Sequence, residues 1–295
     1  MITGFAIILD DEILYVSNEH KYPSFEIVLF VEQLINNINP KSLWSLTNIF
    51  FEDGTIKERM IIKHQITEKN QNLFFCITGD FLSVSQEADN MLSEFYEKVT
   101  ANYETAEKIK KFSTHSEFKK VIKLITGYLW DKYKDPLQDE ELNYQCANTE
   151  NKIIYCGIST QGLPILSQLY DKSMLQSFHR DINDENIELF TSSLSAKLAT
   201  IAMNTQIRAK TNIKEVHFDD LEEGGCKKLI LYGDINGYSL DLIASGDFFK
   251  IKEIFKELEE KVSQEQILQQ EFTGDLKPYR PLKTYLDDII NRFDQ

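Results

Sequence analysis

The same short pattern closes the last predicted strand in each half of this chain. Residues 73–82 are LFFCITGDFL, and residues 240–249 are LDLIASGDFF. In both, an apolar run ends at a hydroxyl residue, a glycine, an aspartate and a phenylalanine. Glycine permits a sharp exit from a strand, and aspartate accepts hydrogen bonds from the first free N–H groups of a following helix. The match predicts that one strand-to-helix unit occurs twice.

The residues around the first copy predict the element order β-β-α-β-β-β-α. Strands are expected over 4–10 and 13–17, a helix over 24–39, strands over 47–51, 56–66 and 73–78, and a helix capped by Asp80. The strand over 56–66 mostly alternates, with Ile56, Met60, Ile62 and Ile66 on one face. This period of two is typical of a strand with one buried face.

The second half repeats this order over residues 151–263. Strands are expected over 153–159, 163–170, 213–218, 228–232 and 238–244, with a helix over 186–204 after the second of them. Residues 233–237 predict a hairpin turn. Asp247 is expected to cap a closing helix over 249–262.

Two further helices set the predicted domain boundaries. We expect one domain over 1–112, a second over 113–263 and a tail over 264–295. A helix over 115–133 is expected to precede the second domain and to end at Asp135-Pro136. The tail carries one apolar stripe, which should dock on this protein or on a partner: Leu282, Tyr285, Leu286, Ile289, Ile290 and Phe293.

The charge of the chain excludes several classes of partner. Its 295 residues include 47 acidic and 32 basic side chains, a net charge of −15. Binding to nucleic acid or to an anionic membrane surface needs a basic face. No apolar run approaches the ~20 residues that span a bilayer. We therefore expect no nucleic-acid partner and no insertion into a membrane.

The sequence also lacks the motifs of catalysis. There is no G-x-x-x-x-G-K-[ST] phosphate loop, and the five histidines are scattered without metal-ligand spacing. The four cysteines form no C-x-x-C pair, which favours a reducing, cytoplasmic location. We expect a protein that is not an enzyme and that holds no cofactor and no metal.

The element order resembles that of the longin and roadblock families, in which two helices accompany a small antiparallel five-stranded sheet. The first half is similar to a longin domain, and the second, with its preceding helix, is more similar to a roadblock domain. The resemblance covers most of the chain and rests on element order, because these families have no diagnostic motif. It implies an α/β (α+β) fold of two such domains. It also implies a platform for small Ras-like GTPases or other longin or roadblock proteins in membrane trafficking or signalling, exchange-factor subunits among them.

Two predicted helices carry candidate partner-binding residues. The helix over 24–39 has a broad buried face, formed by Ile27, Val28, Val31, Leu34, Ile35 and Ile38. Phe25 and Leu29 point away from that face and require another cover. The alternative is that another helix of this chain supplies it.

The helix over 186–204 has a more unusual pattern. Its sheet-facing stripe is Ile187, Phe190, Leu194, Leu198 and Ile201. The reverse face carries Ser192, Ala196, Ala199 and Met203, bordered by Leu189. Small side chains allow a second helix to approach closely, from the first half or from a second copy of the chain in a homodimer. The alternative is that serine and alanine are neutral surface residues.

A different functional class stays open, namely a sensor with two PAS- or GAF-like domains that binds a small ligand. Those domains also wrap helices around an antiparallel five-stranded sheet. A sensor needs a hollow between sheet and helix, with a few polar groups converging inside it. The aliphatic stripes of both helices favour a solid domain instead.

Overall fold

The computed structural model describes residues 1–38, 44–142, 150–160, 162–172, 184–220 and 226–293. The chain divides into two compact units. Unit 1 contains Met1–Phe30, Ser45–Gln145 and Arg208–Asn212. Unit 2 contains Val31–Trp44, Cys146–Ile207 and Ile213–Gln295.

Five antiparallel strands belong to each half of the sequence. The first five are β1 (Ile2–Leu9), β2 (Glu12–Val16), β3 (Trp44–Asp53), β4 (Ile56–Ile66) and β5 (Asn72–Gly79). The other five are β6 (Lys152–Thr160), β7 (Leu163–Leu169), β8 (Asn212–Asp220), β9 (Cys226–Ile235) and β10 (Tyr238–Ser245). Hydrogen-bonded neighbours run β2-β1-β5-β4-β3 in the first set and β7-β6-β10-β9-β8 in the second. The same element order and the same neighbour order therefore occur twice.

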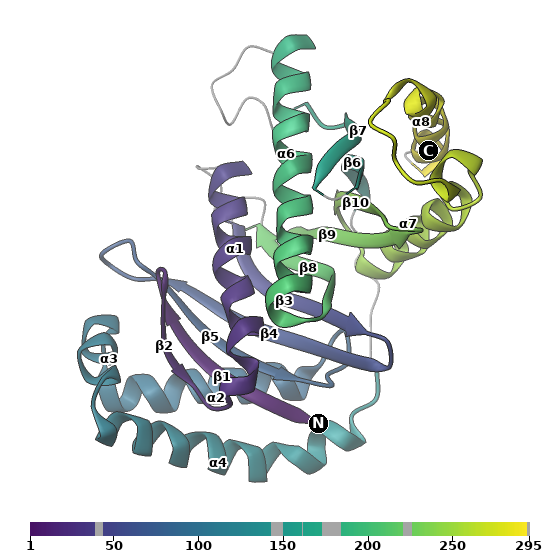
Figure 1. The fold of residues 1–295 in the computed structure, drawn as a ribbon. Helices are drawn as coiled ribbons and strands as arrows, with labels where there is room; N and C mark the ends of the chain where they lie inside the picture. The colour runs from purple at the N-terminus through teal and green to yellow at the C-terminus, as the bar shows by residue number, and fades with distance from the viewer. Residues whose placement is uncertain (39–43, 143–149, 161, 173–183, 221–225, 294–295) are drawn as a thin grey trace. The chain divides into compact units, whose positions relative to one another are not determined.

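The helices follow the strands in a matching sequence. The α-helices are α1 (Tyr22–Ile38), α2 (Gln86–Tyr103), α3 (Ala106–Ser113), α4 (Ser116–Asp139), α6 (Asp184–Asn204), α7 (Phe248–Val262) and α8 (Arg280–Phe293). The short elements are η1 (Glu19–Lys21), the π-helical turn η2 (Thr205–Ala209), η3 (Gln266–Gln269) and η4 (Lys277–Tyr279). Figure 1 shows them along the chain.

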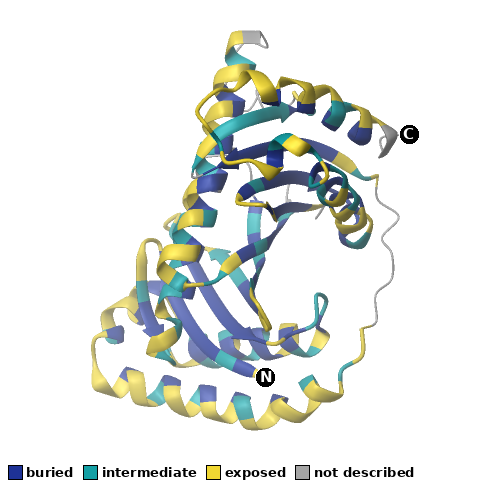
Figure 2. Ribbon diagram, turned by 45° about the vertical axis from the view of Figure 1, so that its right-hand side comes forward, coloured by how far each residue is buried: buried dark blue, intermediate teal, exposed yellow. Residues whose placement is uncertain are grey.

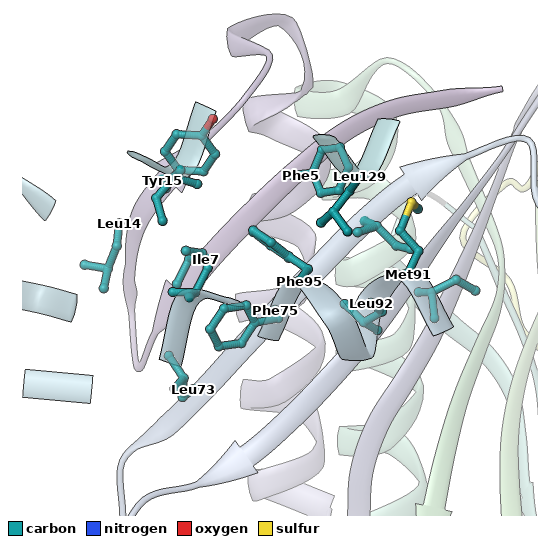
Figure 3. Packing of buried hydrophobic residues seen from close by; sticks show 14 of the residues in the cluster. Phe5, Ile7, Leu14, Tyr15, Leu73, Phe75, Met91, Leu92, Phe95 and Leu129 are labelled. Atoms are coloured by element: carbon teal, nitrogen blue, oxygen red, sulfur yellow. The ribbon is translucent and has the colours of Figure 1, made fainter. Parts of the chain in front are cut away.

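The main core of unit 1 lies between one face of its strands and the helices α2, α3 and α4 (Figure 1). Phe95 of α2 is at its centre, where its ring meets the edges of Phe5 and Phe75 at centroid distances of 5.3 Å in each case (Figure 3). Such edge-to-face pairs add to the stabilisation from burial. Figure 2 shows that α4 is buried on the side that faces the strands and exposed on its outer side.

Unit 2 has a matching core on one face of its strands, which α7 and α8 cover. The tail stripe forms part of it, because Leu282, Leu286, Ile289 and Ile290 are all buried in the cluster. The expectation that this stripe docks is confirmed for these residues, and the surface it docks on is this protein. The side chain of Phe293 lies outside the described residues.

The two Gly-Asp-Phe turns behave differently at the aspartate. Asp247 caps α7 as predicted, with its carboxylate accepting from the N–H of Lys250 at 3.0 Å. Asp80 caps nothing, because α2 begins only at Gln86, where the hydroxyl of Ser85 accepts from Ala88 N. The prediction for Asp80 is therefore wrong.

Both glycines sit where chain segments pass closely. A Cβ on Gly79 would lie 2.8 Å from the carbonyl oxygen of Met1, and a Cβ on Gly246 would lie 2.9 Å from that of Glu150. Met1 directly precedes β1, and Glu150 lies just before β6, so the two glycines have corresponding places. No other residue type fits such a contact without a shift of the backbone.

The helix expected over 115–133 is the largest departure from the prediction. It begins at Ser116, continues through Pro136 to Asp139, and packs in the core of unit 1 rather than preceding unit 2. Leu137 packs against that core, and Glu140 accepts hydrogen bonds from Ser85 and from the N–H of Glu87. These contacts hold the last turn in place despite the proline.

The mixed α/β class with antiparallel strands is confirmed by these elements. That each half is a five-stranded domain of longin or roadblock type is not confirmed, and the boundaries at 112 and 263 stay predictions.

Candidate functional site

The two predicted surface residues on α1 are not both at the surface. Phe25 is completely buried, and its ring lies against Gly4 of β1, where an added Cβ would be 3.4 Å from it. The missing side chain of Gly4 leaves the recess that Phe25 fills, so the outward orientation predicted for Phe25 is wrong. Leu29 is half-buried.

The predicted inner face of α1 agrees with the structure as far as the structure describes it. Ile27, Val28, Val31 and Leu34 are buried. The side chains of Ile35 and Ile38 lie outside the described residues.

Helix α6 is two-faced, as the sequence predicts. Phe190, Leu194, Leu198 and Ile201 of its inner stripe are buried, and Ile187 is half-buried. On the reverse, Leu189 is 59% exposed and Met203 is 42% exposed. Ser192 is exposed and Ala196 half-buried, whereas Ala199 is 4% exposed and belongs to the buried side.

One large apolar residue extends this exposed face beyond the residues that the sequence analysis named. Ile207 of η2 is 66% exposed and follows Met203 by four positions. The spacing of four residues could have indicated from the sequence that Ile207 continues this face. The predicted helix stopped at residue 204, so Ile207 was not included. We call Leu189, Ser192, Ala196, Met203 and Ile207 the α6 surface.

Beneath α6, unit 2 contains a buried cluster of polar side chains that the sequence analysis missed. It is centred on Asp241 of β10, which is fully buried between Leu240 and Leu242. Asp241 lies directly between Gly157 of β6 and Tyr232 of β9 in the strand register. The hydroxyl of Ser239 donates to Asp241 Oδ1 at 2.7 Å.

The glycine in this register makes room for a tyrosine. A Cβ on Gly157 would lie 2.1 Å from the hydroxyl oxygen of Tyr155, so the Tyr155 side chain crosses Gly157 on the face that Asp241 shares. Burial and the charge of Asp241 raise the pKa of Tyr155, and Ser195 of α6 lies on the same side, close to the Tyr155 hydroxyl. The cluster thus joins residues from three strands and one helix.

Five buried polar atoms of this cluster have no hydrogen-bond partner among the described residues. They are Tyr155 Oη, Ser159 Oγ, Ser195 Oγ, Tyr232 Oη and Asp241 Oδ2. Native structures leave few such groups, and an internal water or a ligand is the usual explanation for several together. Burial raises the pKa of Asp241 to about 7, so its carboxyl group is largely protonated below neutral pH.

Unit 1 offers a different kind of site, a surface groove of about 660 Å³ between α4 and the ends of β1 and β2. Its walls include Tyr15 and Val16 of β2, and Lys119, Lys123 and Trp130 of α4. Among the residues that the structure describes, no acidic side chain lines it. The groove is within the size range of sites that hold small ligands or peptide side chains.

Groups suited to metal or thiol chemistry are not gathered in the described part of the chain. No three His, Cys, Asp or Glu side chains among its residues could together hold a metal ion. Cys76 and Cys156 are buried, and burial raises the pKa of both thiols, so neither is a ready nucleophile. In the same described ranges, every helix is too short or too polar to cross a bilayer.

No family model matches this sequence, and no curated protein matches it significantly.

Proposed function

We propose that this protein is a non-enzymatic scaffold or regulator that binds a small Ras-like GTPase, in the manner of a longin or roadblock platform and as an exchange-factor subunit. In this proposal each half is one such domain. The supporting observation is the neighbour order 2-1-5-4-3 around the order β-β-α-β-β-β-α, which occurs twice. Fold analogy supports a function without establishing it.

The α6 surface supplies the contact region in this proposal. Leu189, Met203 and Ile207 expose large apolar side chains on one helical face, between small residues that keep the face open. Exposed apolar residues gathered on one face are typical of protein-binding surfaces. No covalent step is involved, because a partner's switch loops change population when one of their states binds better.

Binding to purified GTPases tests this function directly. Small Ras-like GTPases would be prepared with GDP, with a non-hydrolysable GTP analogue, and free of nucleotide, and affinity would be measured for each state. We expect at least one GTPase to bind with a clear preference among the three states. The triple variant L189D/M203D/I207D should weaken that binding at least tenfold, because charges would replace the apolar contact.

A matched control distinguishes specific binding at the α6 surface from non-specific binding to exposed apolar residues. Leu163 and Leu276 are 57% and 48% exposed in the same unit but lie outside α6, so L163D/L276D should bind as the wild type does. Equal loss in both variants would contradict the assigned surface. Absence of binding in every nucleotide state would reject the proposed function.

The polar cluster around Asp241 favours a second candidate function, a sensor of a small polar ligand with PAS- or GAF-like domains. Its five unpartnered polar atoms are buried among the strands and α6, and a sensor uses such buried polar groups to orient a ligand. Native mass spectrometry of the purified protein would reveal a retained molecule. The G157A variant should release it, because the added methyl group would displace the Tyr155 hydroxyl. A mass equal to that of the bare chain would reject this candidate.

A further inference from the structure

We propose that the groove between α4 and β2 binds an acidic, extended segment of a partner protein, which adds as a strand beside β2. The inference concerns unit 1 alone and does not depend on GTPase binding. It rests on three features, namely unpaired lysines, an open strand edge and a match of spacing between the lysines and an extended strand.

The first feature is local positive charge in an acidic protein. Lys119 and Lys123 line the groove and are exposed, and neither has an ion-pair partner among the described residues. The neighbouring carboxylate of Glu58 is already engaged by Lys21 at 2.7 Å and by the hydroxyl of Thr3. In a chain of net charge −15, two lysines without a carboxylate partner form a local site that can attract an acidic segment.

The second feature is the free edge of β2. Within the described residues, β2 pairs with β1 and is the last strand in the order of neighbours. The N–H of Ser17 donates to the carbonyl of Phe5 at 2.9 Å, so Ser17 turns its polar groups toward β1. Because antiparallel strands alternate, Val16 turns its N–H and C=O outward. An extended segment can hydrogen-bond there.

The third feature is a match of spacing. Lys119 and Lys123 are four residues apart on a helix, which places their Cβ atoms about 6 Å from each other. Alternate side chains of an extended strand are about 6.6 Å apart. Two acidic residues at positions i and i+2 can therefore meet both lysines. Tyr15 and Trp130 lie on the same α4-facing side of β2 and add apolar surface beside the two lysines.

Fluorescence anisotropy with a labelled peptide tests the proposal on the full chain. The probe is a peptide in which valine and glutamate alternate, and its control has glutamine at each glutamate. We expect the glutamate peptide to bind at least tenfold more tightly, and added salt to weaken it. Equal binding of both peptides, or none by either, would overturn the proposal.

Charge reversal then locates the site. The K119E/K123E variant should lose at least tenfold in affinity. The matched control K120E/K134E makes the same change of net charge on the same helix, outside the groove, and should bind normally. Equal losses in the two variants would show attraction by overall charge alone and would reject the groove.

Strand addition and ligand class need separate readouts. Hydrogen exchange at the Val16 amide should slow when the glutamate peptide is bound, and unchanged exchange would rule out strand addition. Inorganic phosphate or phosphatidylserine vesicles, at equal ionic strength, should displace the peptide poorly. Displacement as effective as that by unlabelled peptide would identify an anion or membrane site instead.

Discussion

At the scale of single residues, Asp241 has the largest chemical consequence. Burial destabilises the ionised form of a carboxyl group, because the protein interior solvates the charge less well than water does. The pKa of Asp241 is raised to about 7 by burial, and the hydrogen bond from Ser239 offsets only part of that shift. The folded chain therefore holds a proton that the unfolded chain releases near pH 3.8.

This difference sets the sign of a pH dependence. Between pH 3.8 and about 7, folding takes up a proton at Asp241, so its contribution to stability falls as the pH rises. The slope is at most about 1.4 kcal/mol per pH unit in that interval, and above it the contribution is constant. Tyr155 and Tyr232 face the same group, but burial raises the pKa of both well above their usual value, so they stay neutral here.

We predict that D241N removes this slope and is more stable than the wild type above neutral pH. The amide keeps an acceptor for Ser239 and cannot ionise. Denaturant unfolding at several pH values between about 5.5 and 8 measures the difference. The exposed Asp234 gives the control D234N, which should follow the wild-type curve. Parallel curves for D241N and wild type would contradict the prediction.

At the scale of elements, α6 shows how one helix serves two environments. Its inner stripe packs on strands, and the α6 surface remains open. Ala199 was expected on the reverse face together with Ser192; Ala199 is buried, whereas Ser192 is exposed. At about 100° per residue, Ala199 lies beyond the edge of the face defined by Leu189, Ser192 and Ala196, which explains its burial.

We predict a sharp contrast between two substitutions on this helix. A199E should lower the free energy of unfolding by several kcal/mol, since it buries a charge without a partner. S192E introduces the same charge at an exposed position and should stay within about 0.5 kcal/mol of wild type. Thermal melts of both variants measure the effect. Equal stability of the two would show that the helix face has been assigned wrongly.

At the scale of the whole chain, net charge is the dominant electrostatic feature. With 47 acidic and 32 basic side chains, the folded protein repels itself near neutral pH. Many ion pairs on helices, such as Lys108–Glu104 and Lys120–Glu117, are exposed and contribute little. Screening by salt should therefore weaken the repulsion between acidic side chains more than it weakens the attraction within ion pairs.

We predict that added sodium chloride raises the melting temperature at neutral pH. Going from low to physiological ionic strength shortens the screening length from roughly 30 Å to about 8 Å. The control is the same titration near pH 4.9, where the net charge is close to zero and the increase should disappear. An equal rise at both pH values would contradict the electrostatic cause.

The sequence alone determined the elements and their repetition. The apolar runs, the glycine at each strand exit and the period of α6 are local features, because steric and hydrogen-bonding preferences act within a few neighbouring residues. The helix cap at Asp247 followed from such a preference. In the first half, Ser85 and not Asp80 caps the helix. The inner stripes of α1 and α6 could be read from sequence for the same reason.

Only the tertiary structure decided which polar and apolar side chains meet. Phe25 is buried because Gly4 of another element leaves it room, and Asp241 lies beside Tyr232 because two strands pair in one register. The groove exists because α4 packs in unit 1 and brings two lysines to the edge of β2. Such contacts join residues far apart in the chain, and their free energy depends on packing that no short stretch of sequence specifies.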